Sequence, residues 1–450
     1  AGLVTLVYSI SFAALIFSGD LAPFFPQGLG VALIGATLTA IVAACRSSFS
    51  FAIAGPDSNS IILLALMASA IATSLNTSDG SSQLYPTIWI SFAISTVLTG
   101  FFLFGLGWLR LGQWARFIPY PVIGGFLGGT GWLITRSSFK VMVGFPLNFS
   151  QIPALLHPDL LPHWLIGLAF ALGLFYALNR YKHFFVLPGL LIAGIVCFDV
   201  LWWLGDRFLV NMEPANWFFE PFSTQEIWQF WNLATLTRIN WSVLFDQIGT
   251  LVAMMLIVVI SILLNATGLE LAASKNVDLN RELRVNGIAN LITGLCGGMV
   301  GYLSINRSLL NRQAGASRPL AGIASGALCA VVLVFGSAFL AYLPKPIFGG
   351  LLLYIGLGLL FRWAYQARFK FPHLDYALIL LILAIIAKWG FLQGVGAGIV
   401  IACFLFVFNY GRTSVVKHSL SGATYRSNVR RAFPQQMLLQ QKGDCIYILM

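Results

Sequence analysis

Apolar segments about as long as a lipid bilayer is thick recur along almost the whole chain. A helix needs roughly 20 predominantly apolar residues to cross the hydrocarbon core of a bilayer. Runs of about this length, separated by short polar stretches, account for most of the 450 residues. With 58% hydrophobic and 9% charged residues, the chain has too few polar side chains to cover a soluble globule of its size. The sequence therefore predicts an all-α, multi-pass integral membrane protein.

The apolar runs fall into two sets of seven, separated by residues 205–243. This separating segment is rich in Trp and Phe, including Trp217 and Phe219, which is typical of an interfacial linker with aromatic anchors. We therefore expect 14 transmembrane segments, in a first repeat over about 1–204 and a second over about 244–410. The runs lie near 2–18, 28–45, 57–75, 86–109, 119–135, 161–179, 184–204, 244–268, 285–300, 304–315, 319–343, 346–361, 373–388 and 391–409.

Lysines and arginines are distributed unevenly between alternate loops. If the even-numbered spans end in the cytoplasm, most of the 26 basic residues lie on the cytoplasmic side, as expected for membrane proteins. Both termini are then cytoplasmic, and a bacterial inner membrane is the expected location. Because each half has seven spans, the halves cross in opposite orientations and form inverted repeats if they share a fold. The net charge of +11 fits this loop pattern better than a nucleic-acid-binding stripe, so no nucleic acid partner is expected.

The third apolar run contains a helix breaker and a carboxylate, in the segment FAIAGPDSNSII from Phe51 to Ile62. Pro56 suits the first position of a helix, where its missing N–H is not needed. Asp57 and Ser58 would then lie in the first turn, where side-chain oxygens accept hydrogen bonds from free backbone N–H groups. The pattern predicts a half-helix that begins near the middle of the membrane.

The tenth run is interrupted at the equivalent place in the second half. In GGMVGYLSINRSLLNRQAG, residues 297–315, three glycines precede Ser304 and Asn306, which are good capping residues, and the helix that follows is too short to cross a bilayer. Broken backbone at membrane depth is tolerated only where protein or water satisfies its polar groups. We therefore expect the two breaks to face each other around a cavity. Two helix N-termini would attract an anion there, and Arg307 would strengthen the attraction.

Three segments resemble the SulP family of inorganic anion transporters. GYLSINRSLLNRQAGASRPLAG (301–322) is similar to the tenth-span signature of that family, and DLNRELRVNGIANLITGLCGG (278–298) to the segment before it. QQKGDCIYILM (440–450) looks like the first strand of the cytoplasmic STAS domain that follows the spans in the family. The matching positions in the first segment are Ser304, Arg307, Ser308, Asn311, Gln313, Gly315 and Ala316.

The resemblance implies an architecture as well as a site. A mobile core domain would move against a gate domain, with the substrate held between the starts of the third and tenth helices, and the protein would be a homodimer. The transmembrane domain would cover 1–410, a cytoplasmic linker 411–435, and the first STAS-like strand 436–450. No metal or cofactor is expected beyond a coupling H⁺ or Na⁺.

Asp57 departs from the family pattern, which usually has a small or apolar residue at that position. A carboxylate there would repel an anion unless it is protonated, paired with Arg307 or turned away from the cavity. It therefore either couples transport to protons or marks a cationic substrate, although it could also simply cap its helix. The candidate substrate-binding residues are Arg307, Ser304, Asn306, Ser308, Asp57 and Ser58, and the candidate ion-coupling residues are Asp57 and, by analogy with related inverted-repeat transporters, Glu270.

Three functions remain open on the sequence alone. The first is secondary active transport of a small inorganic anion of the sulfate or bicarbonate class, coupled to H⁺ or Na⁺. The second is transport of a cationic substrate such as a basic amino acid, with Asp57 as the counter-charge. The third is a channel-like or non-transporting protein on the same scaffold. No nucleotide-binding loop, catalytic triad or metal cluster favours an enzyme.

Overall fold

The computed structural model describes most of the chain as two compact units, residues 1–398 and 399–450, which are considered separately. The described residues are 1–75, 81–112, 120–148, 151–181, 183, 185–208, 217–219, 239–273, 276–335, 343–390, parts of 393–404, 419–421, 432–442 and 447–449.

In the first unit the predicted apolar runs form helices. Proline occupies the first or second position of several of them, including α2, α7 and α17, where its missing N–H costs no helical hydrogen bond. The helices are α1 (Gly2–Ile16), α2 (Phe25–Arg46), α3 (Ser58–Leu75), α4 (Ser81–Trp108), α5 (Tyr120–Val143), α6 (Ile152–Leu155), α7 (Leu161–Arg180), α8 (Val186–Phe208), α11 (Trp241–Phe245), α12 (Ile248–Ala273), α13 (Leu279–Leu295), α14 (Ile305–Gln313), α15 (Leu320–Phe335), α17 (Lys345–Leu360) and α18 (His373–Trp389).

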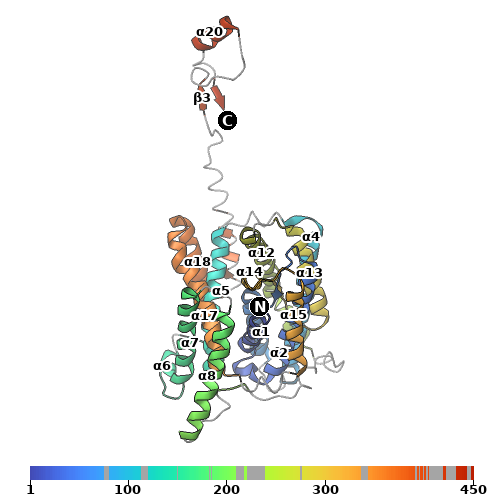
Figure 1. Cartoon of the computed structure of the whole chain (residues 1–450), viewed down its shortest axis with the longest axis vertical. Helices are drawn as coiled ribbons and strands as arrows, with labels where there is room; N and C mark the ends of the chain where they lie inside the picture. The colour runs from blue at the N-terminus through green and yellow to red at the C-terminus, as the bar shows by residue number, and fades with distance from the viewer. Residues whose placement is uncertain are drawn as a thin grey trace. The chain divides into compact units, whose positions relative to one another are not determined.

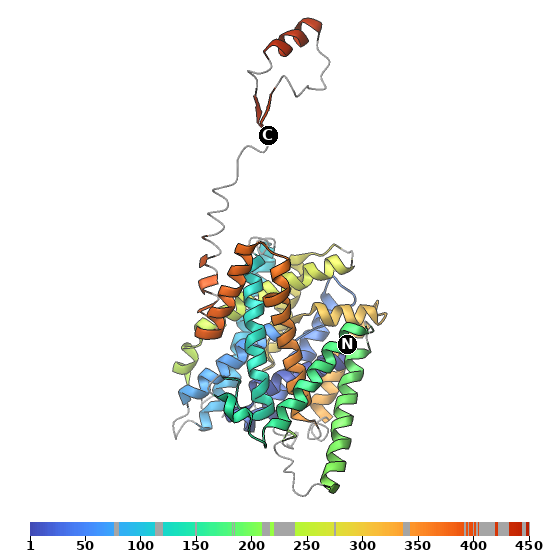
Figure 2. The ribbon, with the colours of Figure 1, turned by 90° about the vertical axis from the view of Figure 1, so that its left-hand side faces the viewer.

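These helices pack as two groups that lie side by side in Figure 1. One group, here called the core group, consists of α1–α4 and α12–α15, with α4 against α13 and α2 against α15. The other, here called the gate group, contains α5, α7, α8, α17 and α18, with α17 between α5 and α7. Figure 2 shows the gate group from its own side. Each group draws helices from both halves of the chain, as inverted repeats require.

Close backbone contact between α4 and α13 holds the core group together. A Cβ atom added at Gly287 would lie 2.6 Å from the backbone N of Phe104, and one added at Gly294 would lie 2.7 Å from the backbone N of Val97. Gly100 on α4 makes the same kind of contact with the backbone N of Leu291. Small residues allow helices in a membrane to approach this closely, because neighbouring helices associate there mainly by packing.

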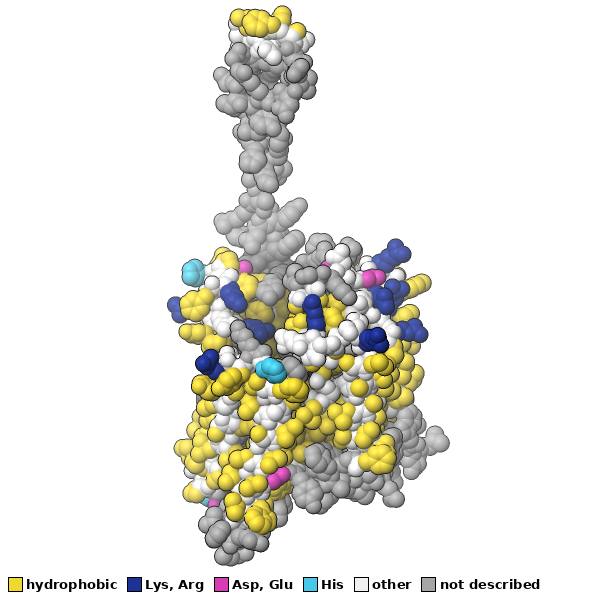
Figure 3. Space-filling model, in the orientation of Figure 1, with side chains coloured by type: hydrophobic (Ala, Val, Ile, Leu, Met, Phe, Trp, Pro, Cys, Tyr) yellow, Lys and Arg dark blue, Asp and Glu magenta, His cyan; other side chains and the backbone are white. Residues whose placement is uncertain are grey.

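On the face shown in Figure 3, apolar side chains cover much of the helical bundle, and lysines and arginines gather toward one end. Among the described residues, seven helices are long and apolar enough to cross a membrane, and the shorter α1 and α15 are apolar as well. The predicted fold class, a helical multi-pass membrane protein with interruptions before the third and tenth helices, agrees with this architecture. The prediction of a half-helix at the third position is wrong, because α3 has 18 residues and is itself long and apolar enough to cross a membrane. The number of 14 spans stays a prediction, because much of the last apolar run lies outside the described residues.

Two local predictions differ from the structure. α3 begins at Ser58, and Pro56 lies two residues before it, so Pro56 is not the first helical residue. Phe219 is not an anchor at the membrane surface, since it is 7% exposed and stacks on Phe25 of α2 with ring centroids 4.4 Å apart. Trp217 stacks on His163 of α7 in the same way. The apolar surface of these rings is therefore packed against protein. Most of the predicted linker 205–243 lies outside the described residues, so its interfacial position stays a prediction.

The second unit contains a two-stranded sheet and a helix. Strand β3 (Ser419–Ser421) pairs antiparallel with strand β4 (Tyr447–Leu449), and helix α20 (Phe433–Gln441) lies between them in sequence. The sequence predicts a linker over 411–435 and a strand over 436–450. The structure places β3 within the predicted linker and α20 over the first part of the predicted strand, because Pro434 near the helix start suits a helix better than a strand. β4 lies within the predicted strand, near its end.

Candidate functional site

The two predicted helix breaks meet in the core group. Strand β1 (Ala54–Gly55) precedes α3, strand β2 (Tyr302–Leu303) precedes α14, and the two pair antiparallel, with Ala54 opposite Leu303. The backbone N–H of Ser304 extends the pairing by donating to the carbonyl of Ile53 at 3.0 Å. α3 and α14 therefore start next to each other, as the sequence predicts. α14 has 9 residues and is indeed too short to cross a bilayer.

Two asparagines of α13 satisfy the broken backbone before α14. Asn290 donates to the carbonyl of Gly301 at 2.8 Å and accepts from its N–H at 3.0 Å. Asn286, one turn earlier on the same face, accepts from the N–H of Leu303 at 2.9 Å, and Asn265 of α12 donates to the carbonyl of Leu303. Sequence reasoning missed this role, although two asparagines four residues apart in a membrane helix just before Gly-Gly are the pattern that indicates it.

Replacing Asn290 with leucine is expected to destabilise the chain strongly. The change leaves the buried N–H and carbonyl of Gly301 without these partners, and each unsatisfied group costs about 1–3 kcal/mol. Thermal unfolding of the purified protein in detergent measures the effect. Asn179→Leu on the exposed surface of α7 is the matched control and should leave the midpoint near that of the wild type. Equal midpoints for the two variants would contradict the role given to Asn290.

Arg307 is the most deeply buried charged group at the breaks, with 1% of its side chain exposed. Its Nη2 donates to the carbonyl of Pro56 at 2.9 Å and to the carbonyl of Gly55 at 3.2 Å. The same nitrogen lies 3.7 Å from Oδ2 of Asp57. Within the described part of the chain, its Nε and Nη1 have no hydrogen-bond partner. Arg307 therefore ties α14 to the start of α3 and does not project into open space.

Asp57 is the more accessible member of this pair, with 23% of its side chain exposed. Oδ1 accepts a hydrogen bond from the hydroxyl of Tyr302 at 3.4 Å and from that of Ser58 at 3.3 Å. The backbone carbonyl of Asp57 accepts the first helical bond of α3, from Ile61. Asp57 thus immediately precedes the helix, and its carboxylate belongs to a polar chain that runs from Tyr302 to Arg307.

The remaining predicted binding residues divide into three groups. Asn306 is exposed in the first turn of α14, and Ser58 is half-buried in the first turn of α3, so both border the meeting point of the helices. Ser304 occupies the N-cap position of α14, but its side chain makes no capping bond. Ser308 is buried, accepts from the N–H of Ile53 at 2.9 Å and donates to its carbonyl, so it fastens α14 to the chain before β1 and has no surface for a substrate.

Glu270 lies farther from the breaks than the other predicted residues. It is half-buried near the end of α12, five residues beyond Asn265. At 1.5 Å per residue this places it about 7.5 Å along the helix from the contact that Asn265 makes with Leu303. Its role in ion coupling stays a prediction. In the described part of the chain, no three His, Cys, Asp or Glu side chains lie close enough together to hold a metal ion.

The net charge at the breaks depends on Asp57. With Asp57 ionised, the pair that it forms with Arg307 is neutral, and the positive ends of α3 and α14 remain. With Asp57 protonated, the positive charge of Arg307 is no longer balanced. The same residues can thus present either a neutral or a positive site, and the exposed group of the pair is the carboxylate.

Comparison with known proteins agrees with this architecture. The chain matches the sequence profile of the Sulfate permease family over residues 1–384. It is 27% identical over 390 residues to the vacuolar basic amino acid transporter VSB1 of Saccharomyces cerevisiae. The aligned region covers 85% of this chain and 38% of the yeast protein. It is 21% identical over 327 residues to the putative sulfate transporter YbaR of Bacillus subtilis, covering 72% of this chain and 63% of that protein. The chain therefore spans less than two thirds of both relatives.

A solved structure shares the fold. The transmembrane domain of a cyanobacterium bicarbonate transporter, BicA, matches with a TM-score of 0.64 at 15% sequence identity, over 88% of this chain and 94% of that one. These proteins are named as transporters, in agreement with the prediction that the chain is not an enzyme. The family resemblance carried by residues 278–298 and 301–322 is confirmed by the profile match, which includes both segments. The resemblance of residues 440–450 to a STAS strand lies beyond the matched residues and stays a prediction. The chain belongs to the sulfate permease family.

Proposed function

We propose that the chain is the transport unit of a secondary active transporter that moves a small inorganic anion of the sulfate or bicarbonate class together with a proton. The observation that carries this proposal is the pairing of buried Arg307 with partly exposed Asp57 where the two broken helices start. In a family of this architecture, alternating access follows when the core group rocks against the gate group.

The pair offers a simple means of coupling. When Asp57 takes up a proton, the charge of Arg307 and the positive ends of α3 and α14 together attract an anion. When Asp57 releases the proton, the pair becomes neutral and the carboxylate repels the anion, which favours release. Arg307 acts mainly through its electric field because its side chain is buried. Ser58, Asn306 and the backbone N–H groups of the first helical turns are placed to contact the anion.

A cationic substrate is the second candidate, and a specific observation favours it. The exposed charge at the site is that of Asp57, whereas the guanidinium of Arg307 is already held by the carbonyls of Gly55 and Pro56. A basic amino acid could therefore use Asp57 as its counter-charge without competition from a free arginine. The similarity to the yeast vacuolar transporter, which is named for basic amino acids, supports this alternative.

Replacing Asp57 with asparagine distinguishes the two candidates. For a proton-coupled anion transporter, Asp57→Asn should still carry sulfate or bicarbonate. The factor by which an inward proton gradient accelerates its uptake should be at least about tenfold smaller than in the wild type, because the proton-accepting group is gone. For a transporter of basic amino acids, the same change should abolish arginine uptake. Uptake into proteoliposomes, with pH and sodium gradients set independently, measures both.

Three outcomes of this experiment decide between the proposals. Full proton dependence in Asp57→Asn would overturn the coupling role of Asp57. Sodium-driven uptake that disappears in Glu270→Gln would move the coupling site to Glu270. Uptake that follows only the electrochemical gradient of the solute, with no response to either ion, would favour the channel-like alternative.

The remaining features of the proposed transporter rest on the sequence and on the family. We place it in a bacterial inner membrane with both termini in the cytoplasm, because the basic loops then face inward. We also propose a homodimer and a STAS-like domain that begins near the end of this chain.

A further inference from the structure

The polar residues at the start of α13 belong to the segment 278–298, and the site at the helix breaks makes no direct use of them. Asp278 caps the helix, because its side chain accepts from the backbone N–H of Arg281 at 3.1 Å. Asn280 accepts from the backbone N–H of Gly112, beyond the end of α4, at 2.9 Å. The first turn of α13 is thus bound to its own backbone and to the chain that leaves α4.

The next two residues bind the chain where α2 ends. Nε of Arg281 donates to the carbonyl of Arg46 at 3.0 Å. The hydroxyl of Ser47 lies 3.0 Å from Oε1 and 3.1 Å from Oε2 of Glu282, and it donates to this carboxylate. The backbone N–H of Ser48 donates to Oε1 at 2.6 Å. We call these contacts of Arg281 and Glu282 with residues 46–48 the clamp.

The carboxylate of Glu282 is the centre of the clamp. Its side chain is 0% exposed, so its charge depends on partners in the protein. The hydroxyl of Ser47 and the N–H of Ser48 supply them, and hydrogen bonds to an ionised group are stronger than those between neutral groups. Glu282 therefore holds Ser47 and Ser48 in one position relative to α13.

Residues 49–53, here called the connector, lead from the clamp to the helix breaks. At the far end, Ile53 bonds to the hydroxyl of Ser308 through both its N–H and its carbonyl. The carbonyl of Phe51 accepts from Asn311 of α14 at 3.2 Å. Strand β1 follows directly, and its last residue, Gly55, supplies a carbonyl to the buried guanidinium at the breaks. The connector is thus held by α13 at one end and by α14 at the other.

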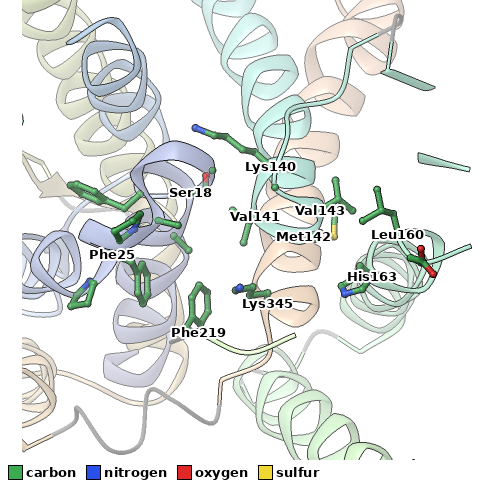
Figure 4. A pocket seen from close by; sticks show the side chains of 18 residues that line it. Ser18, Phe25, Lys140, Val141, Met142, Val143, Leu160, His163, Phe219 and Lys345 are labelled. Carbon is green, nitrogen blue, oxygen red and sulfur yellow. The ribbon is translucent and has the colours of Figure 1, made fainter. Parts of the chain in front are cut away.

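The clamp and the helix breaks both lie within the core group, where α2 packs on α13 and β2 contacts α13. Figure 4 shows one place where the core and gate groups face each other, a cavity of about 410 Å³ lined by Phe25 of α2 and by Val141 and Met142 of α5. Neither Arg281 nor Glu282 lines this cavity. Loosening the clamp should therefore disturb the site inside the core group and leave the contact between the two groups unchanged.

We propose that Glu282 is a positioning residue for solute binding. Through Ser47 and Ser48 it fixes the connector, and the connector fixes β1, whose carbonyl at Gly55 orients Arg307. Contiguous hydrogen-bonded and packed elements of this kind can carry energetic coupling between distant positions. The inference rests on the proposed function, since it requires that solute binds at the helix breaks, but it holds for an anionic or a cationic solute.

Uptake kinetics in proteoliposomes, with the solute that the wild type carries, test the role of Glu282. Glu282→Leu removes both acceptor oxygens and should raise the KM at least about tenfold, because a displacement of about 1 Å in a site can cost about 100-fold. Glu282→Gln keeps one acceptor oxygen and should raise the KM less. The kcat should change less than about twofold in both, since binding is weakened and rocking is not. A purely structural role would instead lower the fraction of active molecules, which reduces kcat and leaves the KM unchanged.

Two further variants and one further measurement complete the test. Ser47→Ala should raise the KM, and adding it to Glu282→Gln should have little further effect, because the two residues share one contact. Arg284→Gln is the matched control, since Arg284 is exposed one turn away from Asn280 and bonds to the carbonyl of its own helix there. Hydrogen exchange should become faster in residues 48–55 of Glu282→Leu and stay unchanged in Arg284→Gln.

An unchanged KM in folded Glu282→Leu would overturn the proposal, as would an equal rise of the KM in Arg284→Gln. Unchanged exchange in residues 48–55 would do so as well. If Glu282→Leu does not fold, an unchanged KM in both Glu282→Gln and Ser47→Ala has the same meaning. A wild-type protein that takes up none of the solutes would overturn the proposed function instead, and hydrogen exchange would still decide whether Glu282 fixes the connector.

Discussion

Replacing Arg307 with alanine is expected to abolish solute uptake and to lower the stability of the protein. The change removes the partner of Asp57 and the donor to the carbonyls of Gly55 and Pro56. Breaking a buried ion pair by deleting one member costs about 3–5 kcal/mol, because the other charge stays behind without compensation. Because α14 also loses its tie to the start of α3, and a displacement of a site by about 1 Å can cost about 100-fold in rate, uptake should fall at least about 100-fold. Proteoliposome uptake and the thermal midpoint in detergent measure the two effects.

Three further variants separate charge from geometry. Arg307→Lys keeps the charge but lacks the planar fork, so it should recover only part of the activity. Adding Asp57→Asn to Arg307→Gln should restore stability relative to Arg307→Gln alone, because the unpaired carboxylate is removed. Arg318→Ala, an exposed arginine outside the site, should behave as the wild type. Normal uptake by Arg307→Ala would show that the pair has no part in transport.

Replacing Gly301 with valine is expected to prevent the two broken helices from meeting. A Cβ atom at this position would lie 2.7 Å from the carbonyl carbon of Gly55 and 3.0 Å from the backbone N of Pro56. Both are backbone atoms that cannot rotate away, so the strands before α3 and α14 would have to separate. Separation breaks the β1–β2 pairing and moves Arg307 from its acceptors. We expect loss of uptake and poor recovery of folded protein, measured by uptake and by gel filtration.

A glycine with free space around it is the appropriate control for this change. A Cβ atom added at Gly173 on α7 would meet no atom within 4 Å in the described part of the chain, so Gly173→Val tests the effect of a larger side chain without a clash. This control should fold and transport normally. Gly301→Ala should already impair uptake, because even one carbon atom meets the backbone of the opposite strand. Wild-type uptake in Gly301→Ala would contradict the close approach of the two breaks.

The parts of the fold that the sequence predicts are those set by local chemistry. Apolar runs of bilayer length give the helices, and the Gly-Pro before Asp57 and the glycines before Ser304 mark the two interruptions. Because broken backbone in a membrane must find partners, the meeting of the breaks follows from the same pattern. These steps need no knowledge of which helices touch.

The features that the sequence does not predict depend on contacts between distant segments. Asn286 and Asn290 read as polar residues within a helix, and only the fold places them beside Gly301 and Leu303. Ser308 matches a family motif, yet its hydroxyl is bound to Ile53. From the sequence, Arg307 is predicted to bind the substrate directly. Its burial against the carbonyls of Gly55 and Pro56 follows only from the fold.

Labelling of a single cysteine at position 306 tests most directly whether solute binds where the two broken helices meet. Asn306 is exposed in the first turn of α14, so an Asn306→Cys variant without the six native cysteines should react with a water-soluble methanethiosulfonate reagent. Val200→Cys on the apolar surface of α8 should not react, since lipid covers it. At ten times its Kd, the transported solute, sulfate, bicarbonate or arginine, should slow the labelling of Asn306→Cys by about tenfold. An unreactive Asn306→Cys, or labelling that none of these solutes slows, would contradict a binding site at the helix breaks.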